Sequence, residues 1–298
     1  MKGQWSIGLL VVVLLVAANA FLIPLAFENA QGPPIDARDR AATTEEAPRP
    51  TESASSADGP DDQSAAAASL LMSSGGELIV SSTRGSCDGG SEPYLRLSAD
   101  RGKSFRTVDL DSEVTAVLAI EVIDDEEVLL LAADEACRTV GYESRDGGRS
   151  WKSVDPRGRW HLDGSDGARR VYSPSGPRTT PCAPRAMSIV RNDIVRLLCP
   201  DGRILRSPND RSWTVIGQLE GAVALRFPIP EVGFSLARQR NCEAAVMRTT
   251  DSGATWERIA CLEGDHPRGI SGQDGLYAAA VDDTVQVSDD RAETWQSP

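Results

Sequence analysis

An all-β fold is predicted for most of the chain by three observations. From about residue 70 onward, short apolar runs of strand length alternate with Gly, Asp, Asn and Pro clusters, without sustained helical periodicity. An eight-residue motif, Ser/Thr-x-Asp-x-Gly-x-Ser/Thr-aromatic, recurs along the same region. Neighbouring copies mostly lie about 40 to 50 residues apart, a spacing typical of four-stranded repeats.

Three copies of the motif match the whole pattern, if Phe is allowed for Trp in the first. They read SADRGKSF at 98–105, SRDGGRSW at 144–151 and TTDSGATW at 249–256. A fourth copy, SDDRAETW at 288–295, has Ala292 in place of Gly, and a shortened copy, SPNDRSW, lies at 207–213. One copy would say little, but four or five at regular intervals predict a repeated hairpin.

The motif resembles the Asp-box, or BNR, repeat of sialidase-like (WD40/YVTN/BNR-like) β-propellers. The resemblance covers about residues 69–298 and implies a single propeller of four-stranded blades, with the boxes away from the ligand-binding face. The spacing predicts five blades, or six if the 63 residues between Asp146 and Asn209 hold a degenerate blade instead of an insertion. Residues 69–72 supply the first inner strand, or the two termini share one blade.

Repetition favours a structural role for the motif, because a catalytic residue is needed once and a structural one in every blade. The Asp can accept backbone N–H groups in the turn, the Gly permits a left-handed conformation, and the aromatic ring buries a large face. The residues expected to brace hairpins are Ser98, Asp100, Gly102, Phe105, Ser144, Asp146, Gly148, Trp151, Trp213, Thr249, Asp251, Gly253, Trp256, Ser288, Asp290 and Trp295.

Two segments precede the propeller. Residues 1–27 contain an uncharged apolar run, which predicts either a signal peptide cleaved after Ala20 or a transmembrane anchor. The length of the run favours the anchor, and Lys2 ahead of it places the N-terminus inside. Residues 28–68 are acidic and rich in Ala, Pro and Ser, which predicts a disordered linker. A signal peptide and an anchor would both export the rest of the chain, so we expect an extracytoplasmic protein, either membrane-anchored or secreted.

Six cysteines without a CxxC pair predict disulfides, which require an oxidising compartment. In the blade parse implied by the resemblance, all six fall on the loop face opposite the boxes. Adjacent positions on that face predict three pairs, namely Cys87–Cys137, Cys182–Cys199 and Cys242–Cys261.

Composition excludes some classes of partner. The net charge of −13 argues against nucleic-acid binding, and two histidines make a multi-His metal site implausible. No metal or other cofactor is expected. Within this acidic chain, residues 156–184 are rich in Arg and aromatic residues. Such residues suit an anionic or sugar-like ligand, although a solvated insertion with paired arginines is the alternative. The candidate ligand-binding residues are Arg159, Trp160, His161, Arg169, Arg170 and Tyr172.

No catalytic residue can be nominated. The sialidase family requires three arginines, an acidic proton donor and a Tyr–Glu pair, and its Arg-Ile-Pro motif does not occur here. We therefore expect a non-catalytic module that binds or scaffolds a protein or glycan on the disulfide-rich loop face, with a membrane contact through an uncleaved N-terminus. The alternative is a sialidase-like glycoside hydrolase with an atypical site, which three arginines and a Tyr–Glu pair in the central funnel would support.

Overall fold

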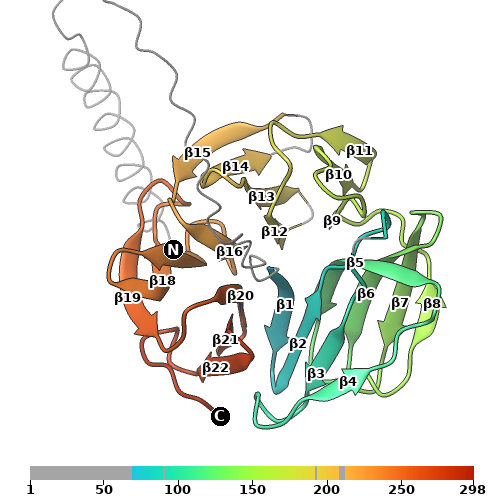
Figure 1. Cartoon of the computed structure of the whole chain (residues 1–298), viewed down its shortest axis with the longest axis horizontal. Coiled ribbons are helices and arrows are strands. Elements are labelled where there is room, and N and C mark those ends of the chain that lie inside the picture. The colour runs from blue at the N-terminus through green and yellow to red at the C-terminus, as the bar shows by residue number, and fades with distance from the viewer. Residues whose placement is uncertain (1–68, 90, 192, 208–211) are drawn as a thin grey trace, which may run out of the picture. The chain divides into compact units, whose positions relative to one another are not determined.

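The computed structural model describes residues 69–89, 91–191, 193–207 and 212–298. The signal peptide or anchor expected over 1–27 and the linker expected over 28–68 lie outside the described residues. In the described part, no helix has the length and apolar character needed to cross a membrane. The described chain is all-β, and its antiparallel sheets form the six blades of a propeller around a common centre (Figure 1). The six-blade alternative is therefore the correct one.

The blades follow one another along the chain, and we number them in that order. Blade 1 contains β1 (Leu70–Gly75), β2 (Leu78–Thr83), β3 (Leu95–Ser98) and β4 (Arg106–Val108). Blade 2 contains β5 (Val114–Val122), β6 (Val128–Asp134), β7 (Thr139–Ser144) and β8 (Lys152–Val154). Blade 3 contains only β9 (His161–Leu162), β10 (Arg170–Ser173) and β11 (Gly176–Thr179).

The second half of the ring is more regular. Blade 4 contains β12 (Ala186–Arg191), β13 (Ile194–Leu198), β14 (Arg203–Ser207) and β15 (Thr214–Gln218). Blade 5 contains β16 (Ala222–Arg226), β17 (Gly233–Gln239), β18 (Cys242–Thr249) and β19 (Glu257–Leu262). Blade 6 contains β20 (Pro267–Gln273), β21 (Leu276–Val281) and β22 (Thr284–Ser288), and a single bridge between Val287 and Gln296 extends its outer edge.

Burial falls from the second strand of a blade to its outer strand. All residues of β6 are buried, whereas β8 is exposed or half-buried. The apolar runs that predicted strands therefore correspond to sheet positions packed between neighbouring blades. One hydrophobic cluster joins blades 1 and 2 through Leu97 and Leu130, and another joins blades 3 and 4 through Trp160 and Leu197.

Blade 3 is the degenerate blade in the 63-residue interval, and its inner strand runs against the others. Arg159, before β9, lies 3.8 Å from Glu121 near the end of β5. The Gly164 carbonyl, after β9, accepts a hydrogen bond from the Cys87 N–H. Gly164 also lies against Ala133, which pairs with the start of β5. These contacts make β9 antiparallel to β5.

The ring closes without a blade shared between the two ends of the described chain. β1 pairs only with β2, so residues from Leu70 onward supply the first inner strand, as one of the two expectations held. Blades 1 and 6 meet through buried side chains instead. The Ser74 hydroxyl donates to the Leu276 carbonyl at 3.0 Å and accepts from the Ser271 hydroxyl at 3.0 Å.

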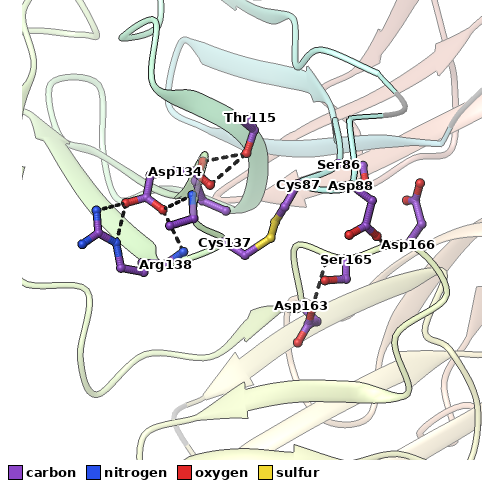
Figure 2. The surroundings of a disulfide bond; sticks show 12 residues. Ser86, Cys87, Asp88, Thr115, Asp134, Cys137, Arg138, Asp163, Ser165 and Asp166 are labelled. Atoms are coloured by element: carbon purple, nitrogen blue, oxygen red, sulfur yellow. Dashed lines mark hydrogen bonds and ion pairs between the residues drawn. A yellow bond between two sulfur atoms is a disulfide. The ribbon is translucent and has the colours of Figure 1, made fainter.

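Three disulfides join Cys87 to Cys137, Cys182 to Cys199 and Cys242 to Cys261, which are the pairs expected from the sequence. The first links blade 1 to blade 2, as Figure 2 shows. Each bridge lies at strand ends opposite the motif hairpins. The two sides of the ring are called the hairpin face and the loop face below, the disulfides being on the loop face.

Candidate functional site

Four full-length motif hairpins, at 98–105, 144–151, 249–256 and 288–295, share one hydrogen-bond pattern, with Ala292 at the Gly position of the last, and we call them the Asp hairpins. In the second, the Ser144 hydroxyl bonds Asp146 at 2.9 Å and accepts from the Gly148 N–H at 2.7 Å. Asp146 also accepts the backbone N–H and hydroxyl of Ser150, at 2.9 and 2.6 Å. The carboxylate is thus occupied by the turn itself.

These bonds favour the ionised aspartate. The hydroxyl and then the backbone N–H of Ser104 hold the pKa of Asp100 at about 2. Thr255 and Thr294 act in the same way on Asp251 and Asp290, whose pKa values also fall to about 2. Carboxylates with such low pKa values are poor proton donors or general bases near neutrality. The geometry supports the structural role expected from repetition.

Three of the Asp hairpins also hold the turn between the first and second strands of their blades, and we call these turns the inner turns. The N–H groups of Arg101, Gly147 and Ser252 follow the motif Asp in each case. They donate to the inner-turn carbonyls of Glu77, Glu126 and Glu231, at 3.0, 2.8 and 2.9 Å. Outer hairpins and inner turns therefore form one layer on the hairpin face.

A cavity of about 400 Å³ occupies the centre of the ring. All six innermost strands or their flanking residues contribute to its wall, where apolar residues outnumber polar ones, although polar atoms provide a comparable share of the exposed surface. One representative residue from each blade in order is Met72, Leu118, Leu162, Met187, Leu225 and Ile270. Small-molecule sites are commonly apolar cavities of roughly 300–1,000 Å³ with a few polar groups. The centre of the ring has the size and character of such a site.

Charged side chains gather where the inner strands end, on the hairpin face. Glu121, Arg191 and Arg226 lie at the C-terminal ends of β5, β12 and β16, and Asp274 directly follows β20. Arg159 precedes the reversed strand β9 and so joins the same group. The mouth therefore combines three cations with two anions in front of an apolar chamber.

The three arginines at the mouth differ in their partners. Arg159 faces Glu121 at 3.8 Å, and Arg191 faces Asp193 at 3.5 Å, and both guanidinium groups are well exposed. Arg226 instead donates to neutral oxygens, from Nε to the Gly272 carbonyl at 3.2 Å and from Nη2 to Gln273 at 2.8 Å. Burial lowers the pKa of Arg226, and the charges of Glu121 and Asp274 oppose that shift.

The six candidate ligand-binding residues do not form one site. Arg159 and Trp160 line the central cavity, and Trp160 is almost completely buried between blades 3 and 4. His161 stacks on Tyr172 with ring centroids 4.8 Å apart. The two remaining candidates bond within blade 3 and the segment after it: Arg169 to the Pro181 carbonyl and Arg170 to Asp163 at 2.5 Å.

His161 belongs to the interior of blade 3. Its Nε2 lies 3.1 Å from the Thr139 hydroxyl of blade 2, and its Nδ1 lies 3.2 Å from the Arg159 carbonyl. Burial lowers its pKa to about 4, so the ring is neutral at pH 7. A neutral, enclosed imidazole with two partners contributes packing and hydrogen bonds between the blades.

The loop face around Cys87–Cys137 is closed by internal contacts (Figure 2). Arg138 pairs with Asp134 at 2.7 Å, and the Asp166 N–H donates to Asp88 at 3.0 Å. Asp163 accepts the Ser165 N–H at 3.0 Å in addition to Arg170. The polar groups at this disulfide are therefore engaged with one another, in contrast to Arg226 in the cavity.

Sequence reasoning missed Arg226, Arg191, Glu121 and Asp274. Each lies at the end of an apolar inner strand or directly after it, so a charged residue at that position was the available indication. Within the described residues, no tyrosine hydroxyl is hydrogen-bonded to a glutamate, and no cluster of three His, Cys, Asp or Glu could hold a metal ion.

Comparison with known proteins gives remote likenesses. No family model matches the sequence, and no curated protein matches it either. Among solved structures, YCF48 from Cyanidioschyzon merolae is 14% identical with a TM-score of 0.42, over 73% of this chain and 78% of that chain. YCF48 bound to D1 peptide is 17% identical with a TM-score of 0.31, over 78% and 67%.

A lectin from Aleuria aurantia, in complex with Fucalpha1-6GlcNAc, is 8% identical with a TM-score of 0.48, over 77% of this chain and 94% of the lectin. At such identities and TM-scores, these likenesses transfer no ligand, partner or activity to this chain.

Proposed function

We propose that this propeller is a non-catalytic binding module, and that its ligand enters the central cavity from the hairpin face. One observation carries the proposal: inner strands of all six blades surround a chamber of about 400 Å³, lined mostly by apolar residues, whose mouth holds Arg159, Arg191 and Arg226. An apolar cavity with a few convergent polar groups is the arrangement that small-ligand sites share.

The proposed site lies on the opposite side of the ring from the loop face favoured by sequence. The reason is that the charged groups on the two sides of the ring have different hydrogen-bond partners. Those around Cys87–Cys137 bond one another, whereas Arg226 contacts only neutral oxygens and faces open volume. Asp hairpins that bond the inner turns would hold this mouth rigid, which suits recognition without movement of the backbone.

Three finer features belong to the same proposal. The shared hydrogen bonds of the Asp hairpins support their assignment as Asp boxes of the BNR type. Three disulfides fit an extracytoplasmic location.

Residues 1–27 would tether the module to the membrane, with residues 28–68 as a spacer. Fractionation tests the tether: the chain should stay with carbonate-washed membranes, and its recovery in the soluble fraction would show a cleaved signal peptide.

The binding site can be tested with anilinonaphthalene sulfonate, a fluorescent amphipathic probe, and the full chain. One probe should bind per chain. Ala119→Phe, which fills part of the cavity wall, should abolish that binding, because Ala119 lines the chamber. The matched control is Ala136→Phe on the loop face, where Ala136 is exposed beside Cys137. Loss of binding in the control variant and not in Ala119→Phe would place the site on the loop face.

The glycoside hydrolase alternative has its own test. Fluorogenic glycosides, including a sialoside, should remain intact in the presence of the full chain. Glu121 is the mouth carboxylate to examine, because it lies 3.8 Å from Arg159 at the cavity opening. Hydrolysis that is lost in Glu121→Gln would overturn the non-catalytic proposal.

A further inference from the structure

Arg226 is a half-buried cation whose charge is not matched by direct contact with an acid. It forms no ion pair within the described residues, because Nε and Nη2 donate to the Gly272 carbonyl and the Gln273 side chain. Its Nη1 has no hydrogen-bond partner within the described residues, and this atom is not fully buried. The residue lines the central cavity, so one guanidinium N–H₂ group remains available to that volume.

Uncompensated burial of a guanidinium is costly, and an anion in contact with it would recover much of that cost. The structure offers only indirect compensation: Glu121 and Asp274 act on Arg226 through space but do not touch it. Glu121 already faces Arg159, and Asp274 is exposed beyond the end of β20. A ligand that reaches Arg226 can therefore bring the missing negative charge.

The remainder of the chamber selects the body of that ligand. Beyond Arg226 the wall is formed by aliphatic side chains such as Leu118, Met187 and Leu225, with Trp160 beside them. The aliphatic side chains offer no hydrogen bonds, so burial of a sugar hydroxyl against them would be unfavourable. An alkyl or aryl group would gain from the same surface. Charge at the rim and apolar surface inside together define an amphipathic ligand.

We propose, resting on the function proposed above, that the cavity binds a small amphipathic carboxylate. Its apolar body lies among the inner strands and its carboxylate accepts hydrogen bonds from Arg226. The acidic residues at the mouth favour a carboxylate over a phosphate. Because Glu121 and Asp274 stand near Arg226, a dianionic phosphate would meet more repulsion than a singly charged carboxylate.

Calorimetric titration of the full chain with three eight-carbon probes tests the assignment. Octanoate should bind with one molecule per chain. Octan-1-ol, which has the same tail without the charge, should bind at least roughly 10-fold more weakly, since a hydrogen bond to a charged group contributes about that factor or more. Octyl phosphate should bind more weakly than octanoate at pH 8, where it is a dianion.

Substitutions separate the charge from the cavity. Arg226→Gln should weaken octanoate roughly 10- to 100-fold and leave octan-1-ol within about 2-fold, because only the charged contact is lost. The matched control is Arg248→Gln in the same blade, which removes an arginine that pairs with Glu257 at 2.6 Å and does not line the cavity, and it should change neither probe by more than about 2-fold. If Arg226→Gln fails to fold, the ratio of octanoate to octan-1-ol affinity in the unsubstituted chain decides the question.

Equal affinities for octanoate and octan-1-ol would overturn the role of Arg226. Absence of octanoate binding, while anilinonaphthalene sulfonate still binds in a manner blocked by Ala119→Phe, would overturn the ligand class and leave the proposed function standing. Loss of cavity binding for every probe would overturn both. A stronger affinity for octyl phosphate than for octanoate would show that the mouth selects dianions and would contradict the carboxylate assignment.

Discussion

Blades 2 and 3 are neighbours, and they are stabilised in different ways. Blade 2 carries a complete Asp hairpin, in which Ser144, Asp146 and Ser150 bond within eight residues of chain. Blade 3 has three short strands and no such hairpin. It depends in addition on contacts to other blades: Trp160 packs against Trp213, and the Trp213 indole N–H donates to the Thr179 carbonyl at 3.0 Å.

The difference shows two sources of blade stability. A hairpin that satisfies its own polar groups is specified locally and can be copied from blade to blade. A blade without one depends on residues distant in sequence, such as Thr139 of blade 2, which bonds His161 of blade 3. Loss of a buried side chain that joins blade 3 to its neighbours should therefore cost more than loss of a hairpin aromatic in blade 2. The two blades should also respond to pH in different ranges.

The largest effect is expected from Trp160→Ala. Trp160 is 2% exposed and sits between blades 3 and 4, so its loss should lower the free energy of unfolding by about 3–5 kcal/mol. Trp151→Ala, in the blade 2 hairpin, is the matched control and should cost less, because Trp151 is only partly buried. Urea unfolding measures both, and an equal or larger cost at Trp151 would contradict the comparison.

The pH dependence of blade 3 should follow His161. Its pKa is about 4 in the folded chain, below the value of about 6.5 usual for an unfolded one. The unfolded chain therefore takes up the proton first, and this contribution to stability declines as pH falls from about 6.5 to about 4. We expect a loss of roughly 1–3 kcal/mol across that range. Urea unfolding of His161→Phe should show a flatter pH profile, and an unchanged slope would argue against this assignment.

A smaller difference is expected between Gly148→Ala and Gly167→Ala. Both glycines have positive φ, 76° in the blade 2 hairpin and 66° in the loop between β9 and β10. A Cβ at 148 would collide with Leu97, whereas a Cβ at 167 would meet no atom within 4 Å. Gly167→Ala should cost about 1 kcal/mol from backbone strain alone, and Gly148→Ala more. Thermal unfolding of the two variants checks the order.

The smallest effect is expected from the carboxylates of the Asp hairpins. Asp251 has a pKa of about 2 in the folded chain, below the value of about 3.9 for an unfolded one. Its contribution is complete above about pH 4 and is lost as pH falls towards 2. Carboxyl chemical shifts followed by NMR should give this midpoint. A midpoint near 4 would indicate that the hairpin bonds do not persist in solution.

Much of the fold could be predicted because its determinants are contiguous. The motif at 249–256 places its donors, acceptor and turn within eight residues, so the sequence marks a hairpin and the strands beside it. The cysteine pairs followed from the same strand positions. Blade 3 was harder to read, because β9 has two residues and runs opposite to β5, and no local pattern encodes that reversal.

By itself, the sequence determined the repeated hairpins, the all-β class and the side of the ring on which the disulfides lie. Only the tertiary structure decided the number of blades and the position of the cavity. Glu121, Arg226 and Asp274 come from three blades and meet only when the ring closes. The physical reason is one of range: hydrogen bonds in a turn are fixed by neighbouring residues, whereas a central chamber is created by the packing of strands that are distant along the chain.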